Sequence, residues 1–171
     1  MQNCLRFMPR KLTFQEVQNL YQRHGPALLA YATSLLPDRG LAEDVLHQVF
    51  LGLLGKSELP DEARPYLFRA VRNRALNSRR NAVRLTSLDD QQWLVKPQGM
   101  MEAGLEVERA LRELPPEQRE VVIMRIWGEM TLAEVAKVLD VPANTVASRY
   151  RYALDRLRKT LNVDMEDIEQ V

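Results

Sequence analysis

The chain has 171 residues, of which 46% are hydrophobic and 27% are charged, as is typical of a protein with a packed core and a charged surface. Its single cysteine, Cys4, excludes an internal disulfide and a multi-cysteine zinc site. No apolar run approaches the roughly 20 residues that a membrane-spanning helix needs, and the N-terminal segment lacks the apolar core of a signal peptide. We therefore expect a cytoplasmic protein with no membrane insertion.

The formal net charge of +1 hides two basic segments. Residues 64–84 contain seven arginines and no acidic residue. Residues 149–159 contain five basic residues and only one acid, Asp155. Two separate basic segments in a nearly neutral protein predict two contacts with one polyanion.

The N-terminal half predicts two helices before the first basic segment. Apolar residues recur at helical spacing over residues 13–35, and Gly25-Pro26 predicts that this stretch is either kinked or divided in two. After a turn, the same spacing continues over residues 41–54. Gly52 would lie inside this second helix and weaken it by up to about 1 kcal/mol relative to alanine.

The first basic segment predicts a third helix over residues 66–80, with Pro65 in its first turn. Leu67, Phe68, Val71, Ala75 and Ser78 fall on one side of this helix, and Arg69, Asn73, Asn77 and Arg80 fall on the opposite side. Arginine and asparagine on one exposed face predict a nucleic-acid contact. The alternative is a solvated face, but such a face normally mixes charges of both signs.

Helical periodicity fails over residues 81–104, and a linker of this length is uncommon inside a compact unit. We therefore expect an all-α chain of two small helical domains, at residues 13–82 and 105–162. A flexible linker at residues 83–104 would join them.

The second domain ends in a predicted helix-turn-helix. Thr131 is a natural N-cap, and Glu134 completes a capping box. Pro142 and the residue before it break the first helix, and Asn144 can cap the second. The exposed face of the second helix carries small hydroxyls, arginines and a tyrosine, which suit the major groove of DNA. These side chains are Thr145, Ser148, Arg149, Arg151, Tyr152 and Arg156. A helical hairpin with a merely solvated basic face is the alternative reading.

With both halves in view, the chain resembles a bacterial RNA polymerase sigma factor of the extracytoplasmic-function (ECF) group of the sigma-70 family. That group consists of two helical domains, region 2 and region 4, joined by a flexible linker. The stretches that carry the resemblance are LAEDVLHQVF (41–50), ARPYLFRAVRNRALNSRR (63–80) and LRELPPEQREVVIMR with TLAEVAKVLDVPANTVASRYRYALDRLRK (111–159).

The resemblance implies a role for each set of residues. The acidic helix of region 2 would bind the largest subunit of core RNA polymerase, and the outer helices of region 4 would bind the second-largest subunit. Residues 59–64 would help to hold a captured base of the −10 element. The core-binding residues would be Glu43, Asp44 and Gln48; the −10 residues Arg69, Arg72, Asn73, Asn77, Arg79 and Arg80; and the −35 residues Thr145, Ser148, Arg149, Arg151 and Tyr152.

The sequence departs from the family in the acidic helix. The family usually has Gln-Glu where this chain has His47-Gln48, and often a tryptophan where it has Leu54. One expected carboxylate is therefore missing, which could alter core binding. Members of the group are commonly held inactive by an anti-sigma factor, so such a partner is also expected.

Two other functions compete with this interpretation. A stand-alone regulator would bind a palindromic operator as a dimer through the helix-turn-helix, but residues 64–84 offer no apolar dimer face. A polymerase-binding protein that does not start transcription is the second alternative. The sequence shows no phosphate loop, metal-ligand spacing or catalytic constellation, so we expect neither an enzyme nor a cofactor.

Overall fold

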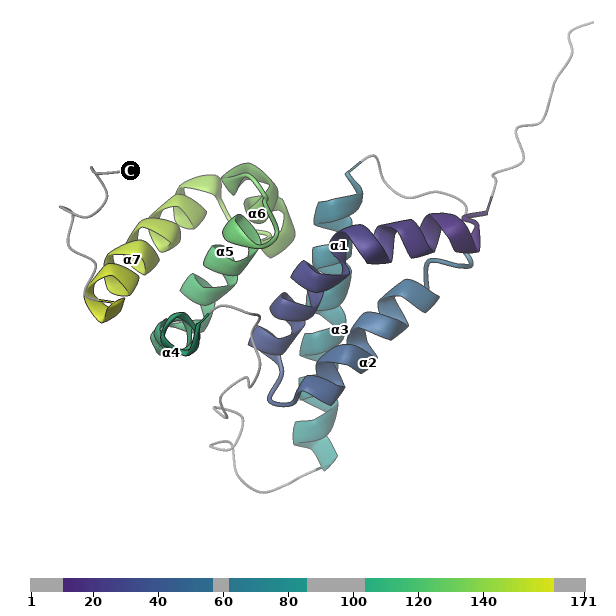
Figure 1. The fold of residues 1–171 in the computed structure, drawn as a ribbon, viewed down its shortest axis with the longest axis horizontal. Helices are drawn as coiled ribbons and strands as arrows, with labels where there is room; N and C mark the ends of the chain where they lie inside the picture. Colours follow the sequence, from purple (N-terminus) through teal and green to yellow (C-terminus); the bar gives the residue numbers. More distant parts are fainter. Residues whose placement is uncertain (1–10, 57–61, 86–103, 162–171) are drawn as a thin grey trace, which may run out of the picture.

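The computed structural model describes residues 11–56, 62–85 and 104–161. Across these ranges the regular structure is α-helical, which confirms the predicted fold class. Figure 1 shows α1–α3 on one side of the molecule and α4–α7 on the other. The helices are α1 (Phe14–Leu35), α2 (Arg39–Leu51), α3 (Ala63–Leu85), α4 (Leu105–Glu113), α5 (Pro116–Ile126), α6 (Leu132–Leu139) and α7 (Ala143–Leu161).

Helix α1 is continuous through the predicted kink. A capping box formed by Thr13 and Glu16 starts it, and Pro26 lies inside it. Proline has no amide hydrogen, so it removes one helical hydrogen bond and favours a bend. Figure 1 shows that the N-terminal and C-terminal parts of α1 run at an angle to each other.

Helix α2 begins two residues earlier and ends three residues earlier than the sequence predicts. Asp38 caps its start by accepting a hydrogen bond from the Gly40 amide at 2.9 Å. The helix ends at Leu51, and Gly52 is its C-cap with αR backbone angles. The prediction that Gly52 lies in the helix interior is therefore wrong, because a tighter turn begins there and the Leu53 amide donates to the carbonyl of Phe50 at 3.0 Å.

Helix α3 is longer than predicted at both ends. It starts at Ala63 and continues to Leu85, so residues 83–85, which we expected in the linker, are helical. Residues 86–103, the rest of that segment, lie outside the described residues. The last residues of this segment therefore extend α3, a helix that packs against α1, α2 and α6.

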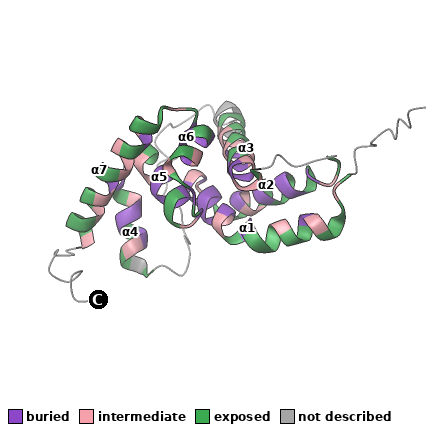
Figure 2. Cartoon of the chain, turned by 90° about the horizontal axis from the view of Figure 1, so that it is seen from above, coloured by how far each residue is buried: buried purple, intermediate pink, exposed green. Residues whose placement is uncertain are grey.

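The helices share one apolar core. The Tyr31 and Phe68 rings lie 5.3 Å apart and join α1 to α3, and the Tyr21 ring packs edge-on against Phe50 to join α1 to α2. The same cluster of buried side chains continues into α4–α7 through Val121, Met124 and their neighbours. Figure 2 shows buried residues on the inner sides of both groups of helices. The first half of the molecule (α1–α3) and the second half (α4–α7) are therefore packed against each other.

Local polar contacts fix the geometry of the second half. The Arg119 side chain donates to the carbonyls of Leu111 (2.9 Å), Arg112 (2.8 Å) and Leu114 (3.0 Å), which satisfies the open C-terminal end of α4. Burial and the nearby Arg112 lower the pKa of Arg119. Pro115 and Pro116 then start α5 without a side-chain cap.

The helix-turn-helix forms as the sequence predicts, apart from its second cap. Thr131 and Glu134 make the predicted capping box of α6. Asp140 ends α6 in the left-handed region, with φ of 57°. The prediction that Asn144 caps the second helix is wrong, because α7 starts at Ala143 and the Pro142 carbonyl accepts its first hydrogen bonds.

We predict that Thr131→Ala destabilises the protein by about 1 kcal/mol, because it removes the side-chain acceptor for the Glu134 amide. Urea unfolding followed by circular dichroism measures this free energy. Thr160→Ala is the control, since Thr160 is exposed near the end of α7 and caps no helix. An equal loss in both variants would contradict a capping role for Thr131.

Candidate nucleic-acid interface

The outer face of α7 is available for contact. Arg151 and Tyr152 are exposed, and the Arg151 guanidinium lies 5.2 Å from the centre of the Tyr152 ring. Thr145, Ser148 and Arg149 are half-buried on the same helix. Only Val146 and Ala153 are buried in α7, and Figure 2 shows this helix at the edge of the molecule. The predicted groove-facing side chains are thus accessible or partly accessible.

The predicted sidedness of α3 is confirmed. Leu67, Phe68, Val71 and Ala75 are buried in the core, whereas Ser78 is only half-buried. On the other side, Arg69, Asn73, Asn77 and Arg80 are exposed, and Arg79 is half-buried. Among these residues, the two asparagines and Arg80 form an exposed polar face.

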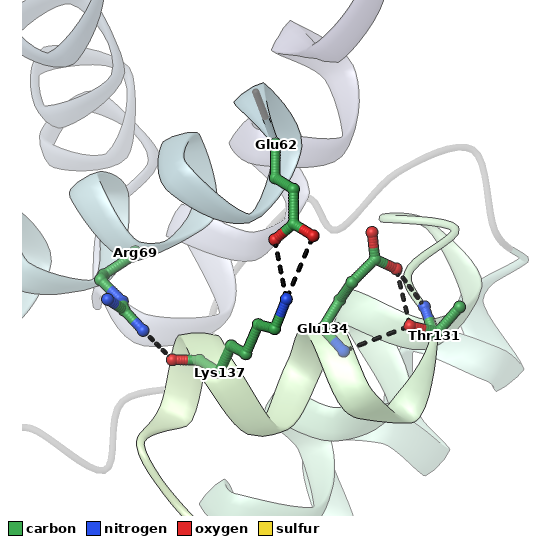
Figure 3. A network of polar contacts seen from close by, with 5 residues as sticks. All are labelled: Glu62, Arg69, Thr131, Glu134 and Lys137. Atoms are coloured by element: carbon green, nitrogen blue, oxygen red, sulfur yellow. Dashed lines mark hydrogen bonds and ion pairs between the residues drawn. The ribbon is translucent and has the colours of Figure 1, made fainter. Parts of the chain in front are cut away.

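Arg69 and Arg72, in contrast, contact the second half. The Arg69 guanidinium donates to the backbone carbonyl of Lys137 in α6 (Figure 3). Arg72 Nε lies 3.2 Å from Oε2 of Glu120 in α5. Two of the six predicted −10 residues are therefore occupied by contacts inside the protein.

Glu120 is an unusual partner because it is itself buried. Burial raises the pKa of its carboxyl group, while the Arg72 charge and hydrogen bond, followed by the Arg149 charge, oppose that rise. Arg149 belongs to the predicted −35 set. One buried carboxylate is therefore influenced by a candidate arginine from each of the two helices that are predicted to contact DNA.

The Tyr31 hydroxyl lies beside this ion pair. It is buried within reach of the Arg72 guanidinium but makes no hydrogen bond of good geometry among the described residues. Burial, with a smaller effect from Glu120, raises the pKa of the Tyr31 phenol well above its usual value. The Tyr31 phenol is therefore neutral and lies next to the Arg72 guanidinium.

Two more ion pairs join the halves. Lys137 Nζ lies 3.0 Å from Oε2 of Glu62, as Figure 3 shows, and Arg64 Nη2 lies 3.6 Å from Oε2 of Glu129. Arg64 also donates to the Glu129 carbonyl at 2.9 Å. The sequence analysis missed these pairs, since their partners are at least 65 positions apart and no local pattern links them.

The predicted polymerase-binding residues lie on α2. Asp44 is exposed, Glu43 pairs with Arg39 one turn earlier at 2.9 Å, and Gln48 Oε1 accepts a hydrogen bond from Arg74 at 3.0 Å. His47, the departure from the family pattern, is exposed on the same helix. Asp44 is thus the most available carboxylate of the set.

The predicted base-holding loop is only partly described. Residues 57–61 lie outside the described residues, whereas Glu62 and Arg64 are placed at the start of α3. Both of these side chains contact α6 or the turn before it, as the two ion pairs above show. The Glu62 and Arg64 side chains therefore point toward the second half of the molecule in this structure.

His24 sits where α1 meets α3 and the turn before α6. Burial lowers the pKa of His24, and the charges of Arg64 and Arg23 act in the same direction, while Glu129 opposes them. The neutral imidazole is therefore favoured in the folded protein. Among the described residues no cluster of histidine, cysteine and acidic side chains could hold a metal ion, and no helix is long and apolar enough to cross a bilayer.

A helix-turn-helix with an accessible basic face, joined to a second helix rich in arginine and asparagine, defines a DNA-binding protein. Comparison with known proteins identifies its family. Residues 20–85 match the model of sigma-70 region 2, and residues 110–159 match the model of sigma-70 region 4.

Named relatives extend this match over most of the chain. The chain is 32% identical to the RNA polymerase sigma-E factor of Streptomyces coelicolor, over 90% of this chain and 89% of the relative. It is 31% identical to the ECF RNA polymerase sigma factor SigL of Mycobacterium tuberculosis, over 83% of this chain and 86% of the relative. The chain therefore belongs to the sigma-70 family, as an RNA polymerase sigma factor of the ECF group.

Two solved structures share the fold. The sigma factor RpoE of Bartonella quintana, in complex with the anti-sigma factor NepR, matches with a TM-score of 0.68 and 22% identity, over 88% of this chain and 99% of that one. CnrH, in complex with the cytosolic domain of CnrY, matches with a TM-score of 0.59 and 25% identity, over 89% and 91%.

We predict that His24 makes the protein less stable in mild acid. Its lowered pKa means that the unfolded chain binds more protons, so stability is lost as pH falls from about 6.5 through the folded-state value. His24→Gln, which cannot take up this proton, should lose less stability between pH 7.5 and 5.5. Melting temperatures at the two pH values test this. His47→Gln, on the exposed face of α2, should change with pH as the original protein does; identical behaviour of all three proteins would contradict the prediction.

Proposed function

We propose that this sigma factor binds core RNA polymerase through α2 and recognises promoters through α3 and α7, without a catalytic step of its own. The observation that carries the proposal is the presence, in one chain, of two basic helices inside the region 2 and region 4 matches. Core polymerase and the chromosome are cytoplasmic, so we place its action there.

The proposed polymerase contact is the exposed acidic face of α2. Asp44 would supply the main charge, with Glu43 and Gln48 beside it. Glu43 and Gln48 already have partners inside the protein, Arg39 and Arg74, which orient them. Region 2 would dock on the largest polymerase subunit and region 4 on the second-largest, as the family resemblance implies.

The proposed −10 contact is the polar face of α3. Asn73 and Asn77 could hydrogen-bond an unpaired base, since amides offer both a donor and an acceptor. Arg69, Arg72, Arg79 and Arg80 would hold the phosphate backbone beside it. Turning a base out of the stack costs a few kcal/mol, which such contacts would offset.

The proposed −35 contact is the outer face of α7 in the major groove. Arg151 and Tyr152 are the most exposed of the five candidates, and Thr145, Ser148 and Arg149 lie nearer the start of the helix. This is the usual placement of a recognition helix, whose N-terminal residues reach base edges. An anti-sigma partner is also proposed, since both structural neighbours were solved with proteins bound: NepR, named as an anti-sigma factor, and the cytosolic domain of CnrY.

We predict that purified protein binds bacterial core RNA polymerase and that Asp44→Arg weakens this binding at least tenfold, through charge reversal at the proposed interface. Fluorescence anisotropy with labelled protein measures the dissociation constant. Gln18→Arg, which places the same cation on an exposed position of α1, should bind normally. Binding that is unchanged in Asp44→Arg would argue against α2 as the polymerase contact.

We predict that the holoenzyme selects promoters from a random DNA library and that Arg151→Ala weakens their recognition at the −35 element. A lost arginine contact to a base is worth about 1–3 kcal/mol, or roughly 5- to 150-fold in affinity. Band-shift assays with the selected promoter measure this loss. Arg158→Ala, in the last turn of α7 and near Asp155, should cost less. Failure to select any promoter would contradict the proposed function itself.

A further inference from the structure

The exposed face of α2 changes in charge along the helix. Four exposed side chains, spaced three and four residues apart, form this face: Asp44, His47, Gln48 and Leu51. The acidic residues of α2 are Glu43 and Asp44, which both lie in its first half. Residues 45–56 contain no acid. The negative charge of this face is therefore confined to the N-terminal half of the helix.

Arg74 of α3, which packs against α2, brings a positive charge to the other end of this face. Its Nη1 donates a hydrogen bond to Oε1 of Gln48 at 3.0 Å, and a Cβ added at Gly52 would lie 3.7 Å from its Nη2. The guanidinium therefore lies beside the last turn of α2, where that helix has no basic residue of its own. A cation at this place is favourable, because the open carbonyls of a helix end carry a partial negative charge.

The partner that holds Arg74 leaves its charge uncancelled. Gln48 is a neutral amide, and residues 64–84 around Arg74 contain no acid, so neither side of this contact offers a carboxylate. Arg74 and Gln48 are both exposed. A glutamate at position 48, which the family usually has, would form an ion pair with Arg74. In this chain the same place on the surface is cationic.

This face therefore fits a surface that carries its charges in the opposite order. Asp44 and Gln48 are four residues apart, which is about 6 Å along the helix axis. A complementary surface would place a cation opposite Asp44 and a carboxylate opposite Arg74, roughly one helical turn further on. Leu51, which is 66% exposed, lies at the Arg74 end of the face. An apolar contact there would exclude water and strengthen a neighbouring ion pair.

We propose that Arg74 determines the specificity of this sigma factor for core RNA polymerase, by binding a carboxylate on the surface that receives α2. The inference rests on the proposed function of α2, and it adds a second helix and a charge of the opposite sign to that contact. Gln48 holds the guanidinium in place without cancelling its charge. The change from the family pattern at position 48 thus selects a polymerase surface with an acid at this place.

A purely structural role for Arg74 leads to different expectations. If the guanidinium only stabilises the end of α2, then Gln48→Glu should leave core binding as tight as before or, as the family pattern suggests, make it tighter. If Arg74 binds a carboxylate of polymerase, Gln48→Glu should weaken core binding, because it cancels the charge and repels that carboxylate. The direction of this one change separates the two roles.

Fluorescence anisotropy of the labelled full chain with core polymerase measures the binding. Arg74→Gln should raise the dissociation constant about fivefold, Arg74→Glu at least tenfold, and Gln48→Glu several-fold. Melting temperatures of the same variants report the structural contribution, and that of Gln48→Glu should not fall. The control is Arg23→Gln, which removes the same charge from an exposed position on α1 and should bind normally.

A double variant tests whether the two positions act together. Because Gln48→Glu acts through the Arg74 charge, it should have a much smaller effect in an Arg74→Gln background. Tighter binding by Gln48→Glu, or unchanged binding by Arg74→Gln, would overturn the proposal. If Asp44→Arg weakens binding but Arg74→Glu does not, this inference alone fails. If Asp44→Arg also binds normally, the proposed contact of α2 with polymerase fails as well.

Discussion

The ion pair between Arg72 and Glu120 is the contact on which the arrangement of the two halves depends. A buried carboxylate is costly unless a cation compensates for its lost hydration, and the raised pKa of Glu120 shows that the compensation is incomplete. Burial lowers the pKa of Arg72 while its partners Glu120 and Tyr31 raise it, with a net rise. The pair therefore joins α3 to α5 through their side chains, beside the apolar core that the two halves share.

This contact also changes how the arginine-rich segment, residues 64–84, is interpreted. From the sequence, seven arginines without an acid favoured a surface for a polyanion over a merely solvated face. In the structure, Arg64 and Arg72 find carboxylates that belong to the other half, at Glu129 and Glu120. Tertiary packing thus supplies negative charges for two of these arginines, which the local sequence does not. Part of the basic surface of α3 therefore serves contacts inside the protein.

Local signals explain what the sequence could predict. The capping box at Thr131, the core side of α3 and the all-α class follow from residues within a few positions of each other, and all three are confirmed. The misplaced ends of α2 and α7 show the limit of such signals, since Gly52 and Asn144 allow more than one role near a helix end. The pairs across the two halves join residues 48 to 75 positions apart, and no periodicity in the chain encodes them.

The three ion pairs between the halves differ in their access to water, and this difference has a consequence for ionic strength. Lys137–Glu62 and Arg64–Glu129 are largely exposed, whereas Glu120 is only 11% exposed at its side chain. Mobile ions weaken exposed pairs strongly and buried pairs little. Added salt would therefore weaken the ion pairs at the rim of the contact before the buried pair at its centre.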